Sequence, residues 1–178
     1  VAATGGSTNA GLHLPAIAHE CGIEFTLNDV AEIFKKTPYI ADLKPGGQYV
    51  AKDVYEAGGV PIIIKTLFDG GYIHGDCMTV TGKTIAENLA SVEFNKDQKV
   101  IRPITNPLSP TGGVVGLKGN LAPDGAIVKV AGMKNTKFEG IAKCFDCEED
   151  AYKCVINENY SEGDVTVSYT HLTLPTKA

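Results

Sequence analysis

The sequence lacks any apolar run long enough to cross a membrane, and it lacks the clustered basic residues of a nucleic-acid-binding protein. Its longest apolar runs, such as residues 60–64, fall far short of the ~20 residues of a membrane-spanning helix. Its 16 basic residues are scattered and outnumbered by 21 acidic ones, whereas phosphate binding needs basic residues gathered on one face. We therefore expect no membrane span and no nucleic-acid partner.

A nucleotide-binding P-loop is also missing. Gly82-Lys83-Thr84 has the ending of the motif G-x-x-x-x-G-K-[ST], but the motif requires glycine at position 77, where this chain has Cys77.

Cysteine is too sparse and too irregular for a disulfide framework. The five cysteines form an odd set without regular spacing, which favours reduced thiols in a cytoplasmic protein. Cys144 and Cys147 form a C-x-x-C motif, but a structural zinc site needs four ligands, and no second C-x-x-C or histidine pair lies near them. We expect no metal site in this chain, and we expect Cys154 to lie on the apolar face of a helix.

The sequence has no initiator methionine, and Val1-Ala2-Ala3 has the composition of the end of a buried strand. We therefore expect the chain to be a fragment of a longer protein. With 178 residues, of which 43% are hydrophobic, it is long enough for one core or two small ones.

Helical patterns fill residues 7–89. The first predicted helix follows Ser7 and Thr8 and ends at Gly22, with an inner face of Ala10, Leu14, Ile17 and Ala18. Pro15 leaves one straight helix, a kink or a fresh helix as alternatives. Further helices are predicted after a capping box at Thr26, over residues 50–57, from Pro61 to about residue 69, and over residues 84–89.

Beyond about residue 100 the pattern changes to short strands. Antiparallel strands are predicted over residues 114–117, 126–130, 141–145 and 165–167. One helix, capped by Asp146 and with Ala151, Cys154 and Val155 as its inner face, separates the last two strands.

The stretch Gly5-Gly6-Ser7-Thr8-Asn9 has two interpretations. Ser7 or Thr8 can cap the helix that follows. Alternatively, the two glycines let a ligand approach the backbone, while Ser7, Thr8 and Asn9 offer polar groups at the positive end of the helix, which suits a carboxylate or a hydroxy acid.

His74-Gly75-Asp76 places an imidazole and a carboxylate in a glycine-rich loop, which suits acid–base chemistry. A surface turn is the alternative.

Five phrases closely resemble the family of dihydroxy-acid, phosphogluconate and sugar-acid dehydratases. They are GGSTNAGLHLPAIAHE, ADLKPGGQYV, AGGVP, HGDCMTVTGKTIAENL and NPLSPTGGVVGLKGNLAPDGAIVKVAG, and they follow in unbroken order. HGDCMTVTGKT and GLKGNLAPDGAIVKVAG are more similar to the dihydroxy-acid members than to the phosphogluconate members.

The resemblance implies a two-part α/β fold. Residues 1–95 would be the helix-rich end of an N-terminal α/β domain, and residues 96–167 the first part of a β-barrel-like C-terminal domain. Residues 168–178 match nothing expected of the family, and we interpret them as a foreign tail from a sequencing artefact.

The activity implied is that of a hydro-lyase in valine and isoleucine biosynthesis. It would convert 2,3-dihydroxy-3-methylbutanoate and its methylvalerate homologue to 2-keto acids, using an iron–sulfur cluster and Mg²⁺, in a homodimeric enzyme. A sugar-acid or 6-phosphogluconate dehydratase is the alternative. For the isolated chain, the alternative is an inert piece of scaffold.

The resemblance also places the cluster and magnesium ligands before residue 1 and the catalytic base after residue 167. No catalytic or metal-binding residue is therefore expected in this chain. The remaining candidates are substrate-cleft residues, namely Gly6, Ser7, Thr8, Asn9, His74 and Asp76.

Overall fold

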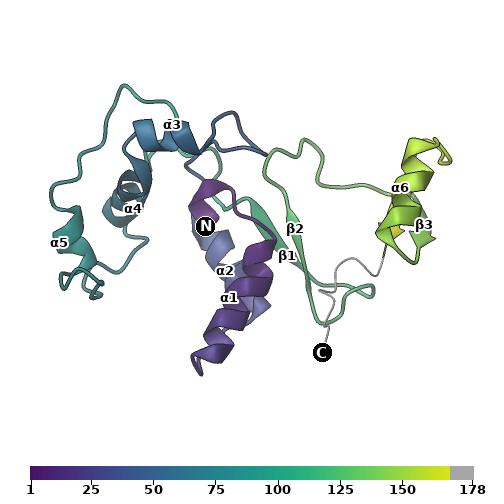
Figure 1. Cartoon of the computed structure of the whole chain (residues 1–178), viewed down its shortest axis with the longest axis horizontal. Helices are drawn as coiled ribbons and strands as arrows, with labels where there is room; N and C mark the ends of the chain where they lie inside the picture. The colour runs from purple at the N-terminus through teal and green to yellow at the C-terminus, as the bar shows by residue number, and fades with distance from the viewer. Residues whose placement is uncertain (169–178) are drawn as a thin grey trace. The chain divides into compact units, whose positions relative to one another are not determined.

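The computed structural model describes residues 1–168, which belong to two compact units (Figure 1). The first unit spans Val1–Lys134, and the second begins at Asn135. The first contains the 3₁₀ turn η1 (Ala2–Thr4), helices α1 (Asn9–Glu20), α2 (Leu27–Lys36), α3 (Ala51–Glu56), α4 (Gly59–Asp69) and α5 (Ile85–Leu89), and strands β1 (Val114–Leu117) and β2 (Ala126–Lys129). The second contains β3 (Ile141–Phe145), α6 (Glu148–Ile156) and β4 (Asp164–Ser168).

Local sequence signals start two of the helices. At α2, the Thr26 hydroxyl accepts a hydrogen bond from the Asp29 N–H at 3.4 Å, and the Asp29 carboxylate accepts one from the Thr26 N–H at 2.7 Å. Thr84 and Glu87 make the same reciprocal pair at α5. Each pair satisfies N–H groups that have no partner inside the helix, so the capping box predicted at Thr26 is confirmed.

Helix α1 is one continuous helix through Pro15, which decides among the three alternatives. It ends as predicted at Gly22, whose φ is +67°. The N–H of Gly22 donates to the His19 carbonyl, and the N–H of Ile23 donates to the Ala18 carbonyl. This pair of bonds is the Schellman arrangement, which requires the left-handed backbone that glycine adopts easily.

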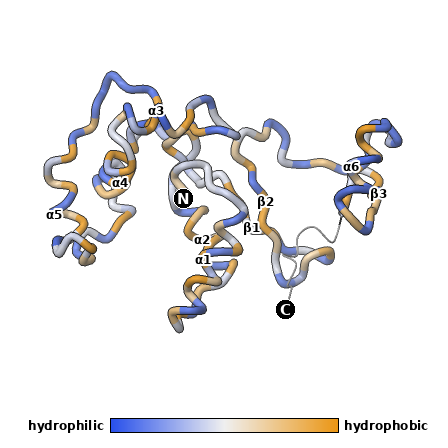
Figure 2. The backbone as a smooth tube through the Cα atoms, viewed as in Figure 1, coloured by the Kyte–Doolittle hydropathy of each residue, from blue (hydrophilic) through white to orange (hydrophobic). Residues whose placement is uncertain are grey.

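The predicted inner face of α1 is largely wrong for the described residues. Ala10 is buried, but Leu14 is 37% exposed and Ile17 is 61% exposed. In the first turn Gly11 lies against Leu27 and Ile127, and farther along Pro15 and Ala18 are only half-buried. Figure 2 shows hydrophobic positions continuing along α1 beyond that turn.

The first unit has two hydrophobic cores. One gathers the segment after α2, helices α3 and α4, and the strand-like residues around position 100, and its buried members are Ala3, Ile40, Ala41, Val54, Ala57, Ile62, Ile63, Leu67, Val100 and Ile101. The other joins η1, α2 and β1 through Ala2, Val30, Phe34 and Val114.

The N-terminal residues form a turn and not the predicted strand. Ala2 and Ala3 are buried in the two cores, and the Ala3 carbonyl accepts hydrogen bonds from the N–H groups of Ile40 and Ala41. The apolar composition therefore indicated burial correctly, but η1 is a 3₁₀ turn.

Strands β1 and β2 form the predicted antiparallel pair, with Val114 opposite Lys129 and Leu117 opposite Ala126. Helix α2 covers this hairpin. A Cβ on Gly116 would lie 2.5 Å from Ala31 Cβ, so glycine at this position of β1 lets the helix pack close to the strand.

The second unit is a β–α–β arrangement in which β3 and β4 are parallel, with Ile141 opposite Asp164. The prediction of an antiparallel pair is wrong here, because α6 carries the chain back to the starting edge, as a crossover helix does. The N-cap of α6 is Cys147 and not Asp146. Cys154 is buried as predicted, but Val155 is 46% exposed.

The fold is therefore a mixture of helices and strands, and the strands of residues 1–168 form two two-stranded sheets without a closed barrel. None of the helices in this range is long and apolar enough to span a bilayer. The division between the units follows residue 134, and the predicted domain boundary at residue 95 stays a prediction. Residues 169–178 of the predicted foreign tail lie outside the described residues.

Candidate functional site

The glycines of the GGSTN stretch occupy a tight turn between η1 and α1. Gly5 and Gly6 have φ values of +84° and +69°. A Cβ on Gly6 would lie 2.8 Å from Phe34 Cζ and 3.0 Å from Val114 Cγ2. Gly6 is therefore required by the packing of the protein itself, and a methyl group there would displace the Phe34 ring.

Ser7 caps α1, whereas Thr8 does not. The Ser7 hydroxyl accepts a hydrogen bond from the Asn9 N–H at 3.2 Å. Thr8 is the N-cap residue by position, but its side chain makes no capping hydrogen bond. Thr8 and Asn9 are exposed. The capping interpretation thus holds for Ser7, and the side chains of Thr8 and Asn9 are available for other contacts.

The turn borders a hollow of about 300 Å³ within the first unit. Its other walls come from Tyr39, from the loop of residues 43–46, and from the end of β2. The full lining is residues 4–7, Tyr39, residues 43–46, Lys129 and Ala131. The lining contains two lysines and no aspartate or glutamate. This composition favours a negatively charged occupant.

Tyr39 is the most unusual residue of this hollow. Its side chain is 7% exposed, and its hydroxyl is buried without a hydrogen-bond partner. Burial raises the pKa of Tyr39, the negative charge of Asp42 raises it further, and the backbone of Leu43 partly opposes this rise. The hydroxyl therefore stays protonated near neutral pH and can donate a hydrogen bond.

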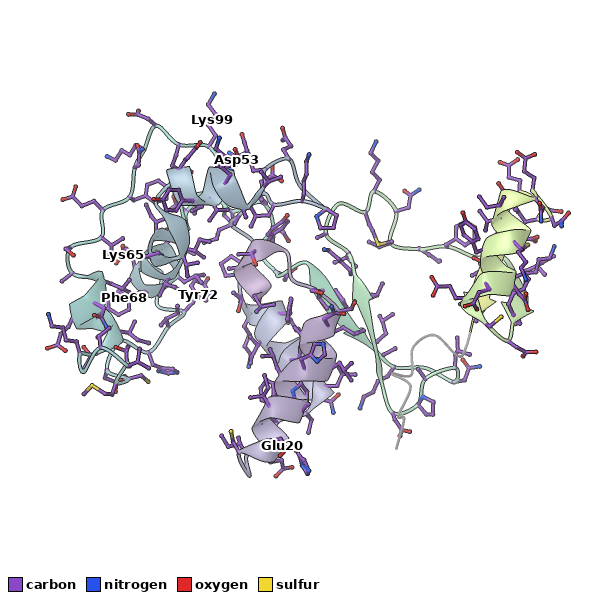
Figure 3. All side chains as sticks on the ribbon, in the orientation of Figure 1. Glu20, Asp53, Lys65, Phe68, Tyr72 and Lys99 are labelled. Carbon is purple, nitrogen blue, oxygen red and sulfur yellow. The ribbon has the colours of Figure 1, made fainter. Side chains whose placement is uncertain are left out.

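His74 and Asp76 lie elsewhere in the first unit, in the turn between α4 and α5. Both are exposed. Gly75 between them is held in place, since its carbonyl accepts a hydrogen bond from the Ala86 N–H at 2.9 Å. A Cβ on Gly75 would lie 3.1 Å from Cζ of Phe68, which Figure 3 labels on α4.

The structure does not bring the two candidate groups together. Neither His74 nor Asp76 lines the hollow beside Gly6 and Ser7. Their part in a substrate cleft stays a prediction.

Another hollow of the first unit, about 600 Å³, contains none of the predicted residues. It mixes basic, acidic and aromatic side chains, namely Asp42, Gln48, Tyr49, Phe94, Lys96, Gln98, Lys99, Ile101, Arg102 and Pro103. Gln48 donates to the Asp42 carboxylate, and Gln98 bonds both backbone groups of Ile101. Asp42, Gln48 and Gln98 therefore stabilise local structure.

The residues of the described range do not fit a metal centre. No group of three or more histidine, cysteine, aspartate or glutamate side chains within residues 1–168 is placed to hold a metal ion. The thiol of Cys154 donates to the Asn159 carbonyl at 3.1 Å. The expectation that this chain has no metal site stays a prediction.

Sequence reasoning missed Tyr39, Lys44 and Lys129. Tyr39 precedes the buried Ile40 and Ala41. Its hydroxyl is therefore a polar group beside an apolar segment, and this was the signal that could have identified it. Lys129 alternates with apolar residues in β2, which is ordinary for a half-exposed strand. The sequence therefore offered no indication that it faces the GGSTN turn.

Comparison with protein families shows two matches that together cover most of the chain. The family model described as "Dihydroxy-acid/6-phosphogluconate dehydratase N-terminal" matches residues 1–88. The model described as "Dihydroxy-acid/6-phosphogluconate dehydratase C-terminal" matches residues 99–170. The predicted foreign tail at residues 168–178 stays a prediction.

Several curated proteins are similar to nearly the whole chain. Dihydroxy-acid dehydratase 2 of Bradyrhizobium diazoefficiens is 70% identical over 94% of the chain, dihydroxy-acid dehydratase of Parvibaculum lavamentivorans is 68% identical over 94%, and dihydroxy-acid dehydratase of Pelagibacter ubique is 70% identical over 94%. The chain spans 29% of the length of each of these relatives.

Proposed function

Since the chain belongs to the dihydroxy-acid/6-phosphogluconate dehydratase family, we propose that it is part of a hydro-lyase that dehydrates small dihydroxy acids. The observation that carries this proposal is the continuous similarity, at 68–70% identity, to three proteins named dihydroxy-acid dehydratase. The family description also names 6-phosphogluconate dehydratase, which makes a phosphorylated sugar acid the second candidate substrate.

The proposed substrates are 2,3-dihydroxy-3-methylbutanoate and its methylvalerate homologue. The reaction removes the proton from C2 and the hydroxyl group from C3 as water, and the resulting enol tautomerises to a 2-keto acid. This conversion serves valine and isoleucine biosynthesis in the cytoplasm. The small dihydroxy acid is the partner that this function requires.

The proposed enzyme contains an iron–sulfur cluster and Mg²⁺, which supply Lewis-acid chemistry. Following the family resemblance, we assign these cofactors, and the catalytic residues, to parts of the protein outside this chain. The isolated chain is then an inert piece of scaffold. Within the whole protein it belongs to a homodimer, and β1 and β2 begin a β-barrel-like C-terminal domain.

The proposed contribution of this chain is one wall of the substrate cleft. The GGSTN turn borders a hollow with two lysines in its lining, which supports a role for Gly6 and Ser7 in shaping the site. The exposed side chains of Thr8, Asn9, His74 and Asp76 are the further candidates for substrate contact.

The test is to recover the longer reading frame and to assay its product under anaerobic conditions. We expect turnover of 2,3-dihydroxy-3-methylbutanoate and its homologue to exceed turnover of 6-phosphogluconate. A clear preference for the phosphorylated sugar acid would contradict the proposal. The 178-residue chain alone serves as the control and should show no turnover.

A further inference from the structure

The Tyr39 hydroxyl is a buried polar group that the fold leaves without a partner. Tyr39 is 7% exposed, and no atom of residues 1–168 has hydrogen-bond geometry toward its hydroxyl oxygen, although the backbone of Leu43 lies close enough to lower its pKa. Buried polar side-chain atoms in native proteins almost always have a partner. An unsatisfied hydroxyl costs free energy of folding, and the cost is removed when a ligand accepts its hydrogen bond.

The hydroxyl end of Tyr39 faces the GGSTN turn at the hollow. A Cβ on Gly5 would lie 3.2 Å from the Tyr39 oxygen. Gly5 and Tyr39 both line the hollow, and the position that a Gly5 side chain would take lies directly beside the buried hydroxyl. Only glycine avoids both the steric conflict and the strained backbone at this position.

Two lysines give the hollow a positive lining. Lys44 is exposed and Lys129 is half-buried. Neither lysine forms an ion pair with any carboxylate of residues 1–168. The Asp42 carboxylate, whose charge reaches Tyr39, lines the larger hollow instead and accepts a hydrogen bond from Gln48. An anion in the smaller hollow would therefore meet two lysines and one hydrogen-bond donor, against the repulsion of Asp42 that also reaches Tyr39.

We infer that this hollow binds the carboxylate of a small organic acid, with the Tyr39 hydroxyl as hydrogen-bond donor and Lys129 and Lys44 as counter-charges. A volume of about 300 Å³ lies at the lower end of the range of small-molecule sites and suits an acid of five or so carbon atoms. The inference rests on the proposed function only for the identity of that acid.

The test uses the 178-residue chain labelled with 3-fluorotyrosine. The ¹⁹F resonance of Tyr39 is assigned by its loss in Tyr39→Phe and is then followed during titration with sodium isovalerate. Ionic strength is held constant with sodium chloride, because salt screens charge attraction. Sodium phosphate is titrated separately, which distinguishes a site for carboxylates from a site for any oxyanion.

We expect isovalerate to shift the Tyr39 resonance to saturation, and phosphate to bind more weakly. Tyr39→Phe should weaken isovalerate binding about tenfold or more, since a hydrogen bond to a charged group is lost. The matched control is Tyr55→Phe, because Tyr55 is 81% exposed on α3. Lys129→Gln should also weaken binding, whereas Lys83→Gln at an exposed turn should not.

The inference is overturned if the Tyr39 resonance does not respond to isovalerate. It is also overturned if Tyr39→Phe binds isovalerate as well as the unmodified chain does, or if phosphate binds more tightly than isovalerate. These outcomes differ from failure of the proposed function. A full-length enzyme that prefers 6-phosphogluconate would contradict the function and leave isovalerate binding at Tyr39 intact.

Discussion

Gly6 provides the sharpest test of how the GGSTN turn is built. The substitution Gly6→Ala adds one methyl group where the φ angle is +69°. That methyl group would lie 2.8 Å from Phe34 Cζ and 3.0 Å from Val114 Cγ2, which is closer than side chains normally pack. Phe34 and Val114 are each 2% exposed and belong to the same core. The ring therefore has no open space into which it can move.

Two effects determine the expected loss of stability. A non-glycine residue in the left-handed region costs roughly 1–2 kcal/mol. Overpacking of a tight core costs roughly a further 1–3 kcal/mol. Gly22→Ala is the matched control, because Gly22 has nearly the same φ of +67° but nothing within 4 Å of an added Cβ. Gly22→Ala should show only the first effect.

The measurement is urea denaturation of the two variants and the unmodified chain. We expect Gly6→Ala to lower the free energy of unfolding by about 1–3 kcal/mol more than Gly22→Ala does. Equal losses in both variants would refute the packing of Phe34 against Gly6. The result also decides how activity data are interpreted, because Gly6→Ala would alter the fold before it altered the approach of a ligand.

Three further predictions concern the hollow, the cap of α1 and the cap of α2. Without ligand, Tyr39→Phe should raise the free energy of unfolding by about 1 kcal/mol, because it removes an unsatisfied buried hydroxyl. Thermal denaturation measures this change, and a loss of stability would show that the hydroxyl has a partner. Ser7→Ala should lower the free energy of unfolding by about 1 kcal/mol, whereas Thr8→Ala should leave it unchanged. Equal melting temperatures for these two variants would contradict the capping role of Ser7. The Thr26 hydroxyl, and then its backbone N–H, lower the pKa of Asp29, so this contribution to stability is present above the ordinary pKa of aspartate and is lost as the pH falls through the lowered value. Asp29→Asn should therefore make stability less dependent on pH in the acid range, and an unchanged acid-denaturation profile would contradict this.

The elements that local chemistry determines could be predicted from the sequence. The capping box at Thr26 and the glycine end at Gly22 depend on residues within one turn of the chain, so their spacing alone was sufficient. The pairing of β3 with β4 is not local. The helical pattern between these strands was the signal for a parallel pair, and the strand pattern alone predicted the wrong direction.

The face of α1 could not be predicted because periodicity shows which residues share a side and not how far a neighbour extends. Ala10 is covered, while Ile17, about two helical turns later, is not.

The candidate site was predicted in part. The glycines and Ser7 were identified because a turn before a helix has a recognisable composition. Tyr39 lines the hollow from the segment after α2, and Lys129 lines it from β2. Only tertiary structure brings such distant positions together.

Phe34 connects the two stretches that the family models treat separately. Its ring lies beneath Gly6 on one side, and a Cβ on Gly112 would lie 2.8 Å from Phe34 Cδ1 on another. The Phe34 carbonyl also accepts a hydrogen bond from the Gly112 N–H at 2.7 Å. Residues 6 and 34 fall in the N-terminal match and residue 112 in the C-terminal match, yet all three share one compact unit. Cutting the gene between the two matches would therefore divide a single cooperative folding unit, and slow amide exchange around Phe34 would require both pieces.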